Sequence, residues 1–131
     1  GGEGNGGVIY PESHYGRDAL VGVGLFLSHF VAEGKSMTAL KATYPQYFIS
    51  KNKMTLSPDM DVDKILEGLK ERYATEKVTD IDGVKIDFAQ GWVHLRKSNT
   101  EPIIRIYSEA KDEAAANQLA EEVIAAAKST F

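Results

Sequence analysis

Residues 84–96, VKIDFAQGWVHLR, decide the fold class of this chain. Apolar residues alternate there with charged, polar or aromatic ones, at Val84, Ile86, Phe88, Val93 and Leu95. Strict alternation places the apolar side chains on one face of a strand, and the glycine between the two halves marks a turn. The stretch therefore predicts two antiparallel strands that cover a core with one face.

Strands are predicted on both sides of this stretch. Residues 78–81 precede it across Asp82-Gly83, a dipeptide typical of a two-residue type I′ turn. Residues 103–109 follow it after a polar loop, and residues 47–56 have the β-branched and aromatic character of an earlier strand.

Two helices complete this part of the chain. One is predicted after Asp61 and has apolar residues at helical spacing up to Tyr73, and the other is an Ala-rich segment over 112–129. From residue 47 the order is β-α-β-β-β-β-α, which favours an α+β fold, an antiparallel sheet with two helices on one face.

The N-terminal third has a different character. Five of the first seven residues are glycine, residues 8–10 suggest a short strand, and residues 36–43 a short helix. Between them, Asp18 begins a helix to about Glu33 that is apolar nearly all round, so we expect burial on several of its sides. The composition changes near residues 45–52, which predicts two parts, 1–45 and 46–131.

Composition excludes several classes of protein. The chain has 131 residues, no cysteine and a formal net charge of −4, which argues against disulfide scaffolds, thiol chemistry and nucleic-acid binding. We see neither a signal peptide nor an apolar run long enough for a membrane, and expect a cytoplasmic protein. Because the first residue is glycine, we expect an excised piece, and the sequence leaves open whether it is an expressed fragment or a proteolytic product.

The N-terminal loop formally matches G-x-G-x-x-G. A dinucleotide site needs this loop to open a helix, whereas Val-Ile-Tyr-Pro follows here, so that interpretation is not favoured. Two remain. The loop is a solvated linker, or Glu3 and Asn5 on the flexible glycine frame bind sugar hydroxyls.

Asp80 and Asp82 resemble part of a carboxylate metal loop, but position 84 is Val where a third oxygen ligand is needed. We interpret them as turn residues and expect no metal site in the chain.

The loop Arg96–Pro102 carries the parts of an anion site. It combines a guanidinium, two hydroxyls, an amide and main-chain N–H groups within a few residues, namely Arg96, Ser98, Asn99 and Thr100. The alternative is a polar turn in which Arg96 pairs with Glu101. Arg105, on the following strand, is expected to make structural pairs with Glu101 and Glu109.

The two loops together resemble those of the α-D-phosphohexomutases. Residues 2–6 resemble the sugar-binding loop of that superfamily, and residues 96–102 resemble its phosphate-binding loop. The resemblance implies four domains in the whole enzyme. Residues 1–45 would be the tail of the third, an α/β domain, and residues 46–131 the fourth, which is similar to the TATA-binding-protein fold.

The resemblance also implies an activity. In the family, an active-site phosphoserine exchanges its phosphoryl group with a hexose phosphate through a bisphosphate intermediate, and three aspartates hold Mg2+. This chain has neither the serine motif nor the aspartate motif, so we expect no catalytic residue and no activity from it alone. By position, Glu3 and Asn5 would bind sugar hydroxyls.

The resemblance likewise implies that the phosphate that is not transferred is bound by Arg96, Ser98, Asn99 and Thr100. Many members have His where Gly7 stands, so a proton-handling role at that position is absent here or lies elsewhere. The sugar stays open, with a lean toward phosphoglucosamine mutases over phosphomannomutase/phosphoglucomutase.

The alternative function is a stand-alone ligand- or protein-binding module without catalysis. We also expect residues 20–31 to mediate self-association in the fragment, since an apolar helix without its partners tends to be covered.

Overall fold

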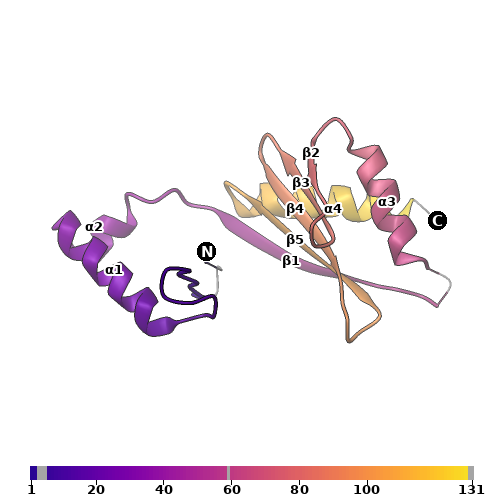
Figure 1. Cartoon of the computed structure of the whole chain (residues 1–131). Coiled ribbons are helices and arrows are strands. Elements are labelled where there is room, and N and C mark those ends of the chain that lie inside the picture. The colour runs from indigo at the N-terminus through magenta and orange to yellow at the C-terminus, as the bar shows by residue number, and fades with distance from the viewer. Residues whose placement is uncertain (3–5, 59, 130–131) are drawn as a thin grey trace. The chain divides into compact units, whose positions relative to one another are not determined.

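The computed structural model describes residues 1–2, 6–58 and 60–129. The chain forms two compact units, Gly1–Pro45 and Gln46–Phe131 (Figure 1), and each is described by itself. That the first unit is the tail of a preceding domain stays a prediction.

The second unit is built on one antiparallel sheet of five strands in the order β1-β5-β4-β3-β2. The strands are β1 (Phe48–Thr55), β2 (Lys77–Thr79), β3 (Val84–Phe88), β4 (Gly91–Lys97) and β5 (Ile103–Ala110). The β1–β5 register pairs Phe48 with Ala110, and the β4–β5 register pairs Lys97 with Ile104. The strands predicted from alternation are confirmed, with bounds shifted by one or two residues.

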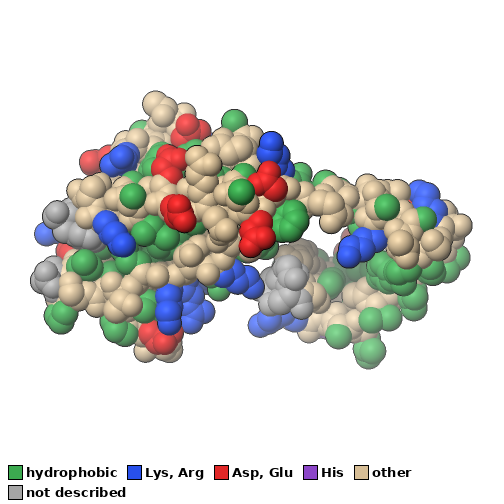
Figure 2. All heavy atoms as spheres, turned by 180° about the vertical axis from the view of Figure 1, so that it is seen from behind, with side chains coloured by type: hydrophobic (Ala, Val, Ile, Leu, Met, Phe, Trp, Pro, Cys, Tyr) green, Lys and Arg blue, Asp and Glu red, His purple; other side chains and the backbone are tan. Residues whose placement is uncertain are grey.

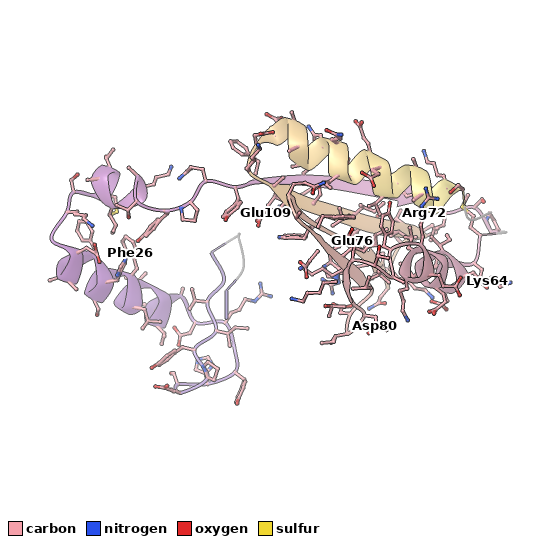
Figure 3. All side chains as sticks on the ribbon, turned by 90° about the horizontal axis from the view of Figure 1, so that it is seen from above. Phe26, Lys64, Arg72, Glu76, Asp80 and Glu109 are labelled. Carbon is pink, nitrogen blue, oxygen red and sulfur yellow. The ribbon has the colours of Figure 1, made fainter. Side chains whose placement is uncertain are left out.

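Two helices cover one face of the sheet, α3 (Val62–Arg72) and α4 (Glu113–Lys128). Figure 3 shows α4 running along the sheet. Each begins where an aspartate accepts main-chain N–H bonds, at Asp61 and Asp112, which satisfies donors that an isolated helix end leaves without partners. The predicted α+β fold, with both helices on one face, is confirmed.

The core lies between this face and the helices. The positions that alternation predicted, Val84, Ile86, Val93 and Leu95, are at most 2% exposed. The residues between them, such as Trp92 and Arg96, lie on the opposite face of the sheet, which neither described helix of this unit covers; we call it the open face. The pleat of the strands thus separates a structural face from one that is available for binding.

The connection between β2 and β3 corrects the turn prediction. Strand β2 ends at Thr79 and β3 starts at Val84, so the connection is Asp80–Gly83 and not a two-residue turn. Within this connection only Gly83 has a positive φ, of 73°, whereas a type I′ turn needs two residues with positive φ. The chain leaves the sheet early: Ile81 is 91% exposed, and the Asp80 carboxylate binds Lys70 on α3.

In the first unit, helix α1 (Ala19–Glu33) runs from an N-cap at Asp18 to Gly34, and α2 (Met37–Lys41) follows. Both helices were predicted. The strand predicted over residues 8–10 is wrong, because the structure has only the isolated bridges Gly2–Val8 and Tyr10–His14.

The expected burial of α1 is also wrong for this chain. None of its residues is buried, and Leu20 is 84% exposed. Little else in this unit is large enough to cover an apolar helix. Figure 2 shows hydrophobic side chains on the surface of the smaller unit. In the part of the chain that the structure describes, no helix is both long and apolar enough to cross a membrane.

Candidate functional site

The β4–β5 hairpin gathers the residues predicted to bind phosphate. They line one shallow hollow of about 170 Å³, formed by Arg96, Lys97, Ser98, Asn99, Thr100 and Arg105. All four residues singled out in the loop are therefore brought together. Lys97 and Arg105 join them, which sequence reasoning did not propose.

The strand register places the two arginines beside each other. Arg96 on β4 and Arg105 on β5 are direct cross-strand partners, and their neighbours Leu95 and Ile104 are fully buried. Both guanidiniums therefore project from the open face, and their side chains are 57% and 52% exposed. Like charges directly opposite each other repel, so an anion between them removes an unfavourable interaction.

The main chain of the loop forms a small cradle. The Ser98 N–H donates to the Ile103 carbonyl at 3.0 Å and extends the strand ladder into the loop. The N–H groups of Thr100 and Glu101 both point to the Ser98 hydroxyl oxygen, at 3.4 and 3.3 Å. In this structure the Ser98 hydroxyl takes up both N–H groups and fixes the shape of the loop, and an anion oxygen that replaced this hydroxyl would meet two adjacent donors.

Each cation of the hollow faces a carboxylate. Arg96 Nη2 lies 2.8 Å from Asp82 Oδ2, and Arg105 Nη2 lies 3.6 Å from Glu101 Oε2. The alternative pairing of Arg96 with Glu101 is therefore wrong. The expected Arg105–Glu101 pair is present, but among the described residues Glu109 accepts from the Trp92 Nε1–H group at 3.0 Å and does not pair with Arg105. Such exposed pairs are weak, typically about 0–1 kcal/mol, so a multiply charged anion can compete with them.

The β2–β3 connection is tied to the helix layer as well as to β4. Lys70 on α3 donates to Asp80 at 3.0 Å. This hydrogen bond lowers the pKa of the Asp80 carboxyl below its ordinary value of 3.8 and raises the pKa of Lys70 above 10.5. Asp80 and Asp82 thus bind different cations, which agrees with their interpretation as turn residues. In residues 1–2, 6–58 and 60–129, no three His, Asp or Glu side chains gather as metal ligands.

The predicted sugar ligands Glu3 and Asn5 lie outside the described residues. On either side of them, the Ile9 N–H donates to the Gly1 carbonyl at 2.8 Å, and Gly2 pairs with Val8. These contacts bring the two ends of the loop together. The role of Glu3 and Asn5 stays a prediction.

Comparison with known proteins identifies the family. Residues 51–126, which include the whole hollow and begin within β1, match the family described as "Phosphoglucomutase/phosphomannomutase, C-terminal domain". The chain belongs to this family. The phosphohexomutase resemblance of the two loops is thereby confirmed, and the chain carries the C-terminal domain of such a protein.

Relatives of this phosphohexomutase domain include proteins with different printed substrates. This chain is 42% identical to "Phosphoglucosamine/phosphogalactosamine mutase" of Sulfurisphaera tokodaii, over 92% of this chain and 27% of the relative. It is also 42% identical to "Phosphoglucomutase/phosphomannomutase" of Thermococcus kodakarensis, over 92% of this chain and 26% of the relative. The chain thus spans about a quarter of the length of these relatives.

A solved structure agrees in fold. A phosphoglucomutase/phosphomannomutase family protein from Burkholderia thailandensis superposes with a TM-score of 0.69 at 24% identity, over 98% of this chain and 28% of that protein. At this identity the likeness supports the fold alone.

Besides Lys97, sequence reasoning missed the place of Arg105 in the hollow and the contact of Asp82 with Arg96. Arg105 was assigned to pairing only, although it also lines the hollow. A signal was present, because a hairpin with its loop over residues 98–102 makes Arg96 and Arg105 cross-strand partners. Asp82 was interpreted as a turn residue, and nothing in the sequence spacing indicates that it contacts Arg96.

Proposed function

We propose that this chain is the substrate-binding C-terminal part of a phosphohexomutase. The whole enzyme would interconvert hexose 1-phosphate and hexose 6-phosphate through a phosphoserine and a bisphosphate intermediate. One observation carries the proposal: in a member of this family, the four loop residues and two further cations line a single hollow on the open face.

The hollow suits the phosphate that is not being transferred. The planar fork of Arg96 can donate to two phosphate oxygens at once, and Arg105 adds positive charge. Lys97 also lines the hollow, but its ammonium lies 3.7 Å from Asp63 on α3. The hydroxyls of Ser98 and Thr100 and the amide of Asn99 supply further hydrogen bonds. Binding energy gained at this distant phosphate aligns the reacting end of the sugar. Glu3 and Asn5 would hold sugar hydroxyls.

The chemical step belongs to other parts of the enzyme. Magnesium, when bound there, would neutralise charge on the transferring phosphoryl group. This chain contributes recognition and orientation only, so we propose that it has no mutase activity alone. Purified chain in a coupled assay should convert no hexose 1-phosphate to 6-phosphate, and turnover above that of a blank preparation would contradict this.

The identity of the sugar is a finer question. Two relatives with the same 42% identity are named for different hexose phosphates, so identity does not separate them. We retain phosphoglucosamine mutase as the leading choice and phosphomannomutase/phosphoglucomutase as the other. Competition between glucosamine 6-phosphate and mannose 6-phosphate for the whole enzyme distinguishes the two.

Affinity measurements on variants test the proposed function. A hydrogen bond to a charged group contributes about 1.5–3 kcal/mol, so Arg96→Ala should weaken binding of glucose 6-phosphate about 10- to 100-fold. Arg96→Lys should recover part of the loss, because one ammonium does not reproduce a two-pronged contact. Arg72→Ala is the matched control, since Arg72 lies on α3 (Figure 3) and binds Ser129. Equal affinities of Arg96→Ala and Arg72→Ala would contradict the proposal.

A further inference from the structure

We propose that Asp82 is a positioning residue for Arg96. It holds the guanidinium from outside the hollow, in the orientation in which Arg96 takes a phosphate. The inference rests on the proposed function and adds to it a residue from another hairpin, the β2–β3 connection.

The contact geometry supports positioning over blocking. Asp82 Oδ2 binds Arg96 at Nη2, 2.8 Å away, which is one end of the guanidinium. A guanidinium has five N–H donors, so a single contact leaves other edges for a ligand. The described residues that line the hollow include Arg96 but not Asp82. The carboxylate therefore contacts Arg96 without forming part of the described lining of the hollow.

The carboxylate is itself fixed in place by strand β4. The His94 Nε2 atom lies 2.6 Å from the main-chain oxygen of Asp82, and because a carbonyl only accepts, that nitrogen carries the proton. The next residue, Gly83, lies directly on the backbone of β4, where an added Cβ would be 2.0 Å from the Leu95 oxygen. Asp82 is thus held through its own carbonyl and through the residue that follows it, and its side chain reaches Arg96 from a defined position.

Arg96 needs such a partner. It is a long, half-exposed side chain opposite another arginine, and repulsion from Arg105 would turn it away from the loop. An unanchored arginine must lose rotamer freedom when it binds a ligand, which weakens binding. Asp82 removes much of that freedom before the ligand arrives, as Glu101 does for Arg105.

Removal of the Asp82 carboxylate should change the phosphate affinity in the direction opposite to that expected from charge repulsion alone. Removing a carboxylate next to an anion site reduces repulsion and should tighten phosphate binding. If Asp82 positions Arg96, its removal weakens binding instead. The direction of the change in affinity therefore separates the two accounts.

The experiment titrates inorganic phosphate into the 131-residue chain and two variants. Asp82→Asn removes the charge and suits the turn, because asparagine before glycine is favoured there. Asp87→Asn is the matched control, since Asp87 lies on the same open face but binds Lys85 and Lys77. We expect Asp82→Asn to weaken binding about 3- to 5-fold, the range of an exposed ion pair, and Asp87→Asn to leave it unchanged or slightly tighter.

A second readout follows Arg96 directly. The Nε–Hε signal of Arg96, assigned by its loss in Arg96→Lys, should show restricted motion in the free wild type and in Asp87→Asn but not in Asp82→Asn. In an Arg96→Ala background, Asp82→Asn should no longer weaken binding. Asp82→Ala, which also removes the acceptor, should weaken phosphate binding at least as much as Asp82→Asn.

The outcomes are distinguishable. The inference is overturned if Asp82→Asn binds phosphate as tightly as Asp87→Asn or more tightly, or if its effect persists without Arg96. Wild type that binds no phosphate in the loop overturns the proposed function, and the inference falls with it.

Discussion

Gly83 offers the sharpest test of how the β2–β3 connection is placed against β4. Its φ is 73°, a region that costs other residues about 1–2 kcal/mol. An added Cβ would lie 2.0 Å from the Leu95 oxygen, and that atom belongs to the backbone of a central strand. In Gly83→Ala the connection must therefore move away from β4. The displacement breaks the His94–Asp82 hydrogen bond, worth about 1 kcal/mol.

Together these effects predict that Gly83→Ala lowers the free energy of unfolding by about 2–3 kcal/mol. Urea unfolding followed by the fluorescence of Trp92, the single tryptophan, measures the unit that contains the change. Gly83→Asn separates the two causes, because asparagine tolerates a positive φ but still carries a Cβ. If the close approach dominates, Gly83→Asn is nearly as destabilised as Gly83→Ala. A loss below about 1 kcal/mol in Gly83→Ala, or full recovery of wild-type stability in Gly83→Asn, would contradict the close approach of Gly83 to β4.

Three further predictions concern the core, the ion pair on α3 and the apolar helix. Ile104→Ala should lower the free energy of unfolding in urea by about 2–5 kcal/mol because Ile104 is fully buried. Ile81→Ala, at a side chain that is 91% exposed, should change it by no more than about 0.5 kcal/mol. Similar losses in the two variants would contradict the assigned core. The carboxyl carbon signal of Asp80 should titrate with a pKa below 3.8, and in Lys70→Met this pKa should return toward 3.8. The ion pair then stabilises the folded state above the pKa of the unfolded chain, and this stabilisation is lost as the pH falls through the folded pKa. An unshifted pKa in the wild type would contradict the contact. Sedimentation of the chain should show self-association that Leu20→Glu reduces, and a monomer at all concentrations would contradict the role of α1.

The order of elements in the second unit could be predicted because local signals determine it. Alternation fixes which side of each strand is buried, so Val93 and Leu95 identify the core face without knowledge of the sheet. Aspartates at helix starts have the same local character: Asp61 caps its helix as expected, and Asp112 caps the last helix at its predicted start. The phosphate loop was found because its ligands are close in sequence.

The features that were missed depend on long-range contacts. Asp80 leaves the sheet for Lys70 on α3, so an Asp-Gly pair that favours a two-residue turn forms part of a longer connection. The contact between Asp82 and Arg96 depends on how the β2–β3 connection lies against β4, which the pattern of one strand does not contain. The exposure of α1 likewise depends on how much chain is present to cover it.

Amide chemical-shift mapping shows where a sugar phosphate binds to this chain. Glucose 6-phosphate is titrated into the 131-residue chain, and the shift of each amide is followed. The account predicts the largest shifts at residues 96–100, with saturation that is weakened in Arg96→Ala. Shifts confined to Asp80–Gly83 or to the turn at Gly34, while residues 96–100 stay unchanged, would contradict it.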